Sequence, residues 1–181
     1  MSVVAGRSTG SLAVMQSLRY FGAVIILASW PLEAADFGAI DVARRYSAAV
    51  LAYDCETMYA LTSNRLKIRD KRPNETRDSL CGFVNLLRRD GITETLDPPR
   101  ASLTDGDRKV VFVTAHREFG SVGRRRITTF DYVVHSSDGG RTWQVLDLGC
   151  VNERWIREIF PSYTGEPPVR AAESKAVELG K

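Results

Sequence analysis

The 181-residue chain has no closely spaced cysteine pair, no long hydrophobic run and no large excess of one charge. Its three cysteines form no C-x-x-C motif, and its two histidines and scattered carboxylates lack the spacing of metal ligands, so the sequence predicts no metal and no cofactor. A net charge of +3 is too small to indicate a nucleic-acid partner or a membrane-surface protein. With 44% hydrophobic and 26% charged residues, the composition excludes a disordered chain, a collagen and a coiled coil.

The uncharged segment 21–30 is too short to cross a membrane. As a helix it would extend about 15 Å, half the thickness of a hydrocarbon core of about 30 Å. Arg19 precedes it and small residues up to Ala35 follow it, which is the order found in signal peptides. We therefore expect residues 1–35 to be a cleaved signal peptide and the protein to be periplasmic or secreted, without a stable membrane anchor. A start at Met15 would give a leader of more usual length, and a short buried core helix is the alternative.

Export would place the three cysteines in an oxidising compartment. Two of Cys55, Cys81 and Cys150 would then form a disulfide, and sequence spacing does not choose among the three pairings. Three reduced, buried cysteines are the alternative. No histidine adjoins any of the three, so the sequence does not indicate a catalytic thiol.

The rest of the chain changes from helical to strand-like patterning. Apolar residues recur with helical spacing in 41–53, 56–62, 79–90 and 152–160. Strand-like composition occurs in 92–96, 109–119, 125–135 and 141–147. Asp54 has the position of an N-cap for the second helix, and 64–78 is polar enough to predict a loop. Helices followed by an antiparallel meander indicate an α+β fold, with N-terminal helices packed on the sheet.

The segment Ser136-Ser-Asp-Gly-Gly-Arg-Thr-Trp143 resembles the Asp-box motif S-x-D-x-G-x-T-W of sialidase-like β-propellers. In those proteins the motif recurs once per blade, whereas this chain has one copy and is too short for a propeller. We therefore predict a structural turn rather than a sugar site. Asp138 would accept hydrogen bonds from backbone amides, Gly139 and Gly140 would supply positive φ, and Trp143 would cover the apolar side.

Residues 38–148 resemble the nuclear transport factor 2-like superfamily, which includes SnoaL-like and ketosteroid isomerase-like proteins. The resemblance rests on the helix pair that meets at Asp54, the third helix, and the ending DGG-x-TW-x-V-x-DL at Asp138–Leu148. It implies a cone-shaped, cystatin-like α+β domain, in which a curved antiparallel sheet wraps around helices and forms a pocket, often in a homodimer. We accordingly expect this domain at 36–164 and a loose tail at 165–181.

Enzymes of that superfamily place an acid or base on the strands that line the cone. Strand alternation puts Asp131 and His135 on one face of 125–135, about 13 Å apart, and His116 lies on the neighbouring strand. These three residues are the catalytic candidates, but they match no catalytic motif of the family, and none receives a catalytic role. The sequence therefore favours a non-catalytic module that binds a small apolar ligand or a protein partner. The alternatives are a small-molecule isomerase or dehydratase with an acid/base pocket, and a periplasmic inhibitor or immunity-type protein.

Overall fold

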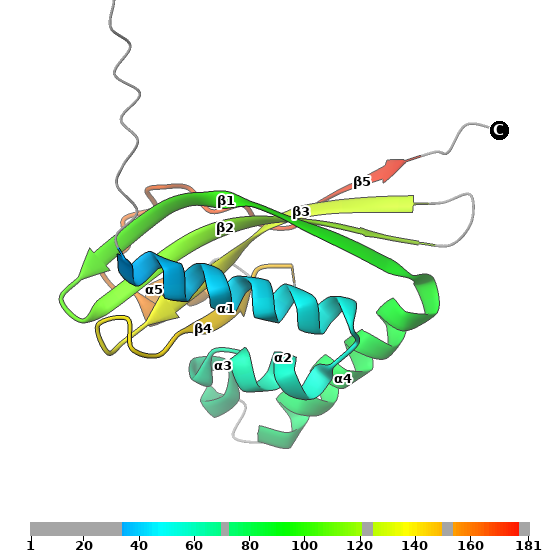
Figure 1. The fold of residues 1–181 in the computed structure, drawn as a ribbon, viewed down its shortest axis with the longest axis horizontal. Helices are drawn as coiled ribbons and strands as arrows, with labels where there is room; N and C mark the ends of the chain where they lie inside the picture. Colours follow the sequence, from blue (N-terminus) through cyan, green and yellow to red (C-terminus); the bar gives the residue numbers. More distant parts are fainter. Residues whose placement is uncertain (1–33, 70–72, 121–124, 150–153, 178–181) are drawn as a thin grey trace, which may run out of the picture. The chain divides into compact units, whose positions relative to one another are not determined.

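The computed structural model describes residues 34–69, 73–120, 125–149 and 154–177. The helices are α1 (Ala34–Leu51), α2 (Cys55–Leu61), α3 (Asn64–Arg69), α4 (Pro73–Asp90) and α5 (Arg154–Ile159), and the strands are β1 (Ile92–Asp105), β2 (Arg108–Phe119), β3 (Arg125–Ser136), β4 (Gln144–Asp147) and β5 (Glu173–Val177). The chain is thus α+β, with helices preceding an antiparallel sheet, as the sequence predicts (Figure 1). Residues 1–33 of the expected signal peptide, Met15 among them, lie outside the described residues.

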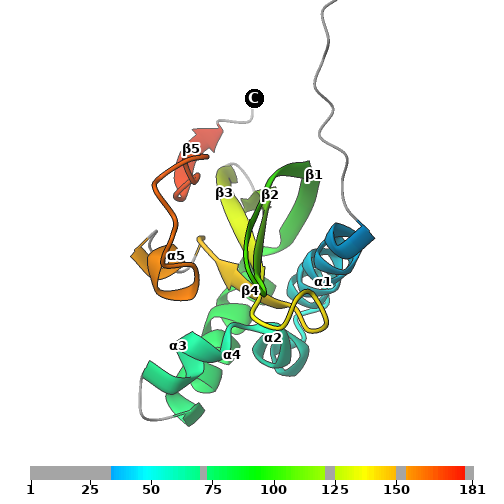
Figure 2. The ribbon, with the colours of Figure 1, turned by 90° about the vertical axis from the view of Figure 1, so that its left-hand side faces the viewer.

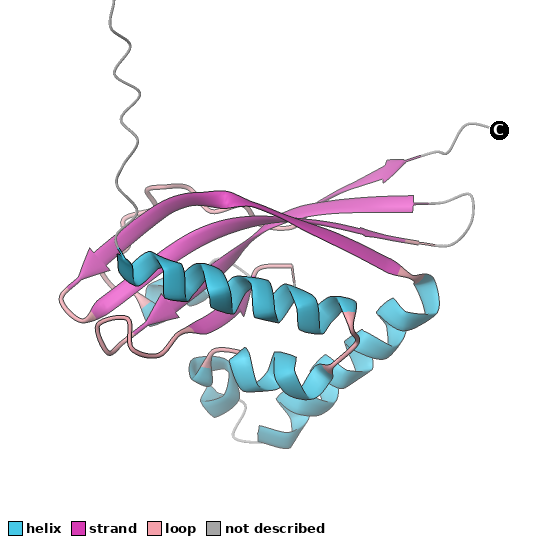
Figure 3. Cartoon of the chain, in the orientation of Figure 1, coloured by secondary structure: helices cyan, strands magenta, loops and turns pink. Residues whose placement is uncertain are grey.

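The sheet is open and has the order β1-β2-β3-β4, with β5 beside β3 (Figure 3). All pairs are antiparallel. β4 pairs with residues 132–135 of β3, whereas β5 pairs with residues 125–129. The two short strands therefore lie one after the other along the same edge of β3.

Each face of the sheet carries its own apolar core. We call the side covered by α1, α2 and α4 the helix face; its buried residues include Tyr46, Met58, Phe130 and Tyr132. The opposite side, the back face, packs Phe112, Val133 and Leu146 against α5. Figure 2 shows α1 and α5 on opposite sides of the strands. This division follows the strand alternation of β3. Phe130, Tyr132 and Val134 belong to the core on the helix face, whereas Val133 belongs to the core on the back face.

The second helix begins where its sequence predicts. The Asp54 carboxylate accepts hydrogen bonds from the Thr57 backbone N–H at 3.1 Å and the Thr57 hydroxyl at 2.6 Å. These bonds lower the pKa of the Asp54 carboxyl, because they stabilise its charged form. α4 ends at Asp90, and the next residue, Gly91, has the positive φ of 70° that suits glycine just beyond a helix C-terminus.

The expected loop at 64–78 is wrong, because α3 and the first six residues of α4 lie within it. α4 begins at Pro73, and proline is favourable at the first position of a helix, where its missing N–H is not needed. The many charged residues of this segment predict a solvated loop, but short or exposed helices such as α3 and the start of α4 accommodate the same charged composition.

β1 does not end at Leu96, where its strand-like composition predicts, but continues through Pro98 and Pro99 to Asp105. It is an edge strand that pairs only with β2 among the described strands, so a proline can sit in it without breaking a second ladder. The register shifts on both sides of Pro99, which is how the pairing accommodates the missing donor.

The expected loose tail is also wrong for the described residues 165–177. Asp131 of β3 donates its N–H to the Arg170 carbonyl at 3.0 Å, and its carboxylate accepts from the Arg170 N–H at 2.7 Å. Val169 packs on the back-face core, and β5 then joins the sheet. These contacts depend on a partner about 40 residues earlier in the chain, which local patterning does not reveal.

A disulfide joins Cys55 at the start of α2 to Cys81 in α4. Glu56 and Arg77 form an ion pair beside it, which links the same two helices. One of the three pairings left open by the sequence is therefore present, while Cys150 lies outside the described residues. None of the described helices is long and apolar enough to cross a membrane.

Candidate functional site

The structure does not bring the three catalytic candidates together. Asp131 is fully buried, and its carboxylate accepts from the Thr114 hydroxyl at 3.0 Å and from the Arg100 guanidinium at 2.6 Å, in addition to the Arg170 amide. Arg100 also donates to the Pro168 carbonyl at 2.8 Å. Asp131 therefore anchors the C-terminal segment to the sheet.

The two histidines have separate partners. His116 contacts the Thr129 hydroxyl at 3.1 Å through Nδ1 and the Asp97 carboxylate at 3.0 Å through Nε2, at a partly exposed position. His135 is buried and contacts the Ser63 hydroxyl at 2.9 Å. Burial lowers the pKa of His135 to about 4, and nearby Arg65 acts in the same direction, so this imidazole is neutral at pH 7.

The largest concentration of buried charge lies on the helix face and was missed by sequence reasoning. It contains one residue from each of four successive strands, Glu94, Arg117, Tyr132 and Asp147, which we call the buried network. Glu94 opposes Arg117 across the β1–β2 ladder, and Tyr132 opposes Asp147 across the β3–β4 ladder. The register of the sheet thus places two pairs of polar residues within reach of one another.

Arg117 is the centre of the buried network. Its guanidinium donates to Glu94 at 2.6 Å, to the Tyr132 hydroxyl at 2.8 Å and to Asp147 at 3.1 Å. The Tyr132 hydroxyl in turn donates to the other oxygen of Glu94 at 2.6 Å. The guanidinium also lies over the Phe130 ring, 4.7 Å from its centre, a cation–π contact that accommodates charge in an apolar setting.

These contacts satisfy the buried network internally. Both carboxylate oxygens of Glu94 accept hydrogen bonds, and the second oxygen of Asp147 accepts from the Gly149 N–H at 2.8 Å. Desolvation raises the pKa of Tyr132 well above its usual value, and the positive charge of Arg117 opposes this effect only in part. The phenol therefore stays protonated, as its donation to Glu94 requires.

One signal in the sequence pointed to this network. Arg117 follows Val113 and Ala115 in strand alternation, so it occupies a position on an otherwise apolar face. An arginine at such a position needs carboxylate partners, because an unpaired buried charge is very unfavourable. The sequence alone does not show that Glu94 and Asp147 supply them.

The Asp138 turn has a dense set of local hydrogen bonds. The Asp138 carboxylate accepts from the backbone N–H groups of Arg141 at 3.1 Å and Thr142 at 2.9 Å, and from the Thr142 hydroxyl at 2.7 Å. These bonds lower the pKa of Asp138 far below its usual range. Gly139 and Gly140 have φ of 76° and 94°. Asp138 therefore uses its carboxylate to close the turn.

Trp143 connects this turn to the helices. Its indole is buried in the helix-face core and lies against Gly38 of α1, where a Cβ atom would come within 2.9 Å of the indole Nε1. Gly38 thus allows α1 to approach the sheet at this point.

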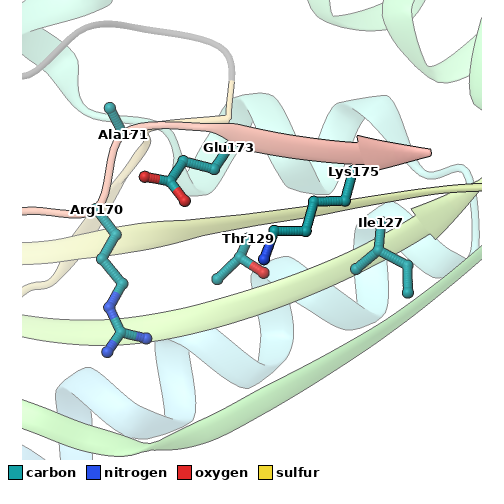
Figure 4. A pocket seen from close by; sticks show the side chains of 6 residues that line it. All are labelled: Ile127, Thr129, Arg170, Ala171, Glu173 and Lys175. Carbon is teal, nitrogen blue, oxygen red and sulfur yellow. The ribbon is translucent and has the colours of Figure 1, made fainter. Parts of the chain in front are cut away.

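Two grooves lie away from the buried network. The larger, with a volume of about 280 Å³, lies over β3 and β5. Its lining residues are Ile127, Thr129, Arg170, Ala171, Glu173 and Lys175, and we call it the β5 groove (Figure 4). The smaller, of about 210 Å³, lies at the end of the β1–β2 pair next to Gly91. Neither groove is lined by a residue of the buried network.

Cys55, Glu56 and Cys81 bring potential metal ligands together among the described residues. The two sulfur atoms are bonded to each other, so neither is available as a thiolate ligand.

No family model matches this chain, and neither does any curated protein or solved structure.

Proposed function

We propose that this chain is an exported, non-catalytic protein-binding domain of the nuclear transport factor 2-like type. The observation that carries this proposal is the filled space between helices and sheet. Tyr46, Phe130 and Tyr132 are fully or almost fully buried there and form edge-to-face ring contacts, with centres 5.2 and 5.5 Å apart. In the superfamily that the sequence resembles, enzymes use this region as their pocket.

The arrangement of polar groups supports a non-catalytic role. Acid/base catalysis requires groups that converge on one reacting atom at hydrogen-bond distance. Asp131 holds the C-terminal segment, His135 is bonded to Ser63, and His116 pairs with Asp97 at another place. Among the described residues, the three candidates named from the sequence therefore do not form the constellation that an isomerase or dehydratase needs. The two carboxylates that do converge, Glu94 and Asp147, are both bonded to Arg117 in the buried network.

One half of the back face is exposed and available for binding. α5 and the segment up to Val169 cover the other half. The uncovered half consists of two cross-strand rows, which we call the open half-face: Thr95, His116, Thr129 and Glu173 in one row, and Thr93, Glu118, Ile127 and Lys175 in the other. These side chains are exposed or half-buried, and together they form a mixed polar surface across four strands.

Export is supported by two independent features. Residues 21–30 have the pattern of a signal-peptide hydrophobic region, and the Cys55–Cys81 disulfide fits an oxidising compartment. N-terminal sequencing of the protein recovered from the compartment outside the cytoplasm should give a start near Asp36. Recovery of uncleaved protein with reduced cysteines from the cytoplasm would contradict export.

The binding role can be tested by native mass spectrometry of the exported protein purified from its own host. We expect a complex with a protein in fixed stoichiometry and no retained small molecule. Thr129→Glu, in the centre of the open half-face, should dissociate the complex, whereas the matched control Thr164→Glu, at an exposed site outside that surface, should not. A bound small molecule, or equal loss of the complex in both variants, would refute the proposal.

A further inference from the structure

The β5 groove contains three exposed charged side chains that have no ion-pair partner among the described residues: Arg170, Glu173 and Lys175. The neighbouring charges are already compensated, because Arg125 pairs with Glu118 at 2.6 Å and His116 contacts Asp97 at 3.0 Å. The groove thus presents two uncompensated cations and one carboxylate. Figure 4 shows Arg170 at one end and Ile127 at the other, with Thr129, Glu173 and Lys175 between them.

The backbone beneath these side chains is fixed. Arg170 is bonded at both its N–H and its carbonyl to Asp131, which is fully buried and is held by Arg100 and Thr114. Lys175 lies opposite Ile127 in the β3–β5 ladder. Cations that project from a rigid backbone lose less conformational freedom when a ligand binds, which favours recognition.

We propose that the β5 groove binds the carboxylates of an acidic, extended segment of a protein partner. This inference rests on the proposed protein-binding function and names the chemistry of the partner. The Arg170 guanidinium can donate two parallel hydrogen bonds to one carboxylate, and the Lys175 ammonium supplies a point charge for a second. Glu173 lies between them and favours a segment whose intervening side chain is a hydrogen-bond donor.

The shape of the surface favours a chain segment over a free anion. The groove is open to solvent and continues into the two rows of the open half-face, so a small anion bound there would keep much of its water. Alternate side chains of an extended segment repeat every 6.5–7 Å or so, the same spacing as Glu173 and Lys175 on β5. A segment that lies along the strands can therefore place successive side chains against successive rows.

The test is a titration of the isotope-labelled mature chain, followed through backbone amide NMR shifts. The probe is an N-acetylated, C-amidated heptapeptide with glutamate at positions 2 and 6 and threonine elsewhere, so that a threonine lies between the two glutamates on the same face of the extended peptide. The same peptide with lysine in place of glutamate, and sodium acetate, are the comparison ligands. We expect the glutamate peptide alone to shift the amides of residues 127–129 and 170–175. Arg170→Ala with Lys175→Ala should weaken its binding about tenfold, and Glu173→Gln should tighten it about threefold, because a like charge is removed.

The matched control is Arg44→Ala with Arg45→Ala on α1, which removes the same charge from two exposed positions. Equal weakening in both double variants would show general electrostatic attraction and overturn the proposal. Full competition by acetate at equal concentration would also overturn it, because the site would then be a small-anion site. If the glutamate peptide fails to bind while the native complex forms and tolerates Arg170→Ala, the groove assignment is wrong but the protein-binding function stands.

Discussion

Replacing Tyr132 with phenylalanine should destabilise the fold through the buried network alone. The ring and its contact with Tyr46 remain, while the bond donated to Glu94 and the bond accepted from Arg117 are lost. Hydrogen bonds to charged groups contribute about 1.5–3 kcal/mol each, and partial relaxation offsets some of that loss. We therefore expect the free energy of unfolding to fall by about 3 kcal/mol at pH 7.

The measurement is guanidinium chloride unfolding with the disulfide intact, comparing midpoints at an unchanged m-value. Tyr59→Phe is the matched control, because Tyr59 is half-buried and its hydroxyl has no hydrogen bond among the described residues. Its effect should be about 0.5 kcal/mol or less. If the Tyr132 variant were as stable as this control, the buried network would not stabilise the fold and the reasoning above would be wrong.

Alkaline pH supplies a second, independent check of the same residue. Burial raises the pKa of Tyr132 in the folded protein above its unfolded value of about 10. Its contribution to stability is therefore present in full below about pH 10 and is lost as the pH rises from there toward the folded pKa. The stability difference between the native protein and Tyr132→Phe should shrink above about pH 10; a constant difference would contradict the assigned protonation state.

Three further predictions concern other parts of the fold. The pKa of His135 is lowered from 6.5 to about 4, so its contribution to stability is present above pH 6.5 and is lost between pH 6.5 and 4. In denaturant titrations over that interval, the free energy of unfolding of the native protein should fall by about 3 kcal/mol more than that of His135→Gln. Parallel pH dependences of the two proteins would refute this. Gly38→Ala should lower the melting temperature, because the new methyl would lie 2.9 Å from a buried indole nitrogen. Gly82→Ala in α4, with nothing within 4 Å, should raise stability by about 0.5–1 kcal/mol. If Gly38→Ala were also stabilising, helix propensity would outweigh packing at that site. Cys55→Ser, which leaves Cys81 unpaired, should lower the free energy of unfolding by about 2–4 kcal/mol. Peptide mapping of the native protein without reductant should recover the two cysteines joined to each other, and a different pairing would refute the assignment.

Features set by local pattern could be predicted from the sequence. The succession of helices and strands, the N-cap at Asp54 and the two faces of β3 follow from apolar spacing and from side chains next to one another in the chain. The α+β class follows from that succession. None of these features depends on knowing which strands pair, or in which register.

The buried network and the C-terminal anchor depend on register and could not be predicted in that way. Arg117 was visible as a charged residue in an apolar row, but its partners became known only when Glu94 was placed opposite it. Asp131 was named as a catalytic candidate because it is a carboxylate on a strand. The structure gives it three hydrogen-bond donors, one of them from a segment that looked like a tail.

The attachment of Arg170 to Asp131 also affects when the protein can finish folding. A chain that ends at residue 164, the domain boundary suggested by the sequence, would leave the Asp131 carboxylate without its Arg170 donor and one edge of β3 uncovered. The residues that complete the sheet follow the other strands in the chain, so they are synthesised after them and, in an exported protein, leave the cytoplasm after them. Closure of this edge only after β5 has crossed would suit a protein that is translocated unfolded, and cleavage between α5 and β5 would leave the sheet incomplete.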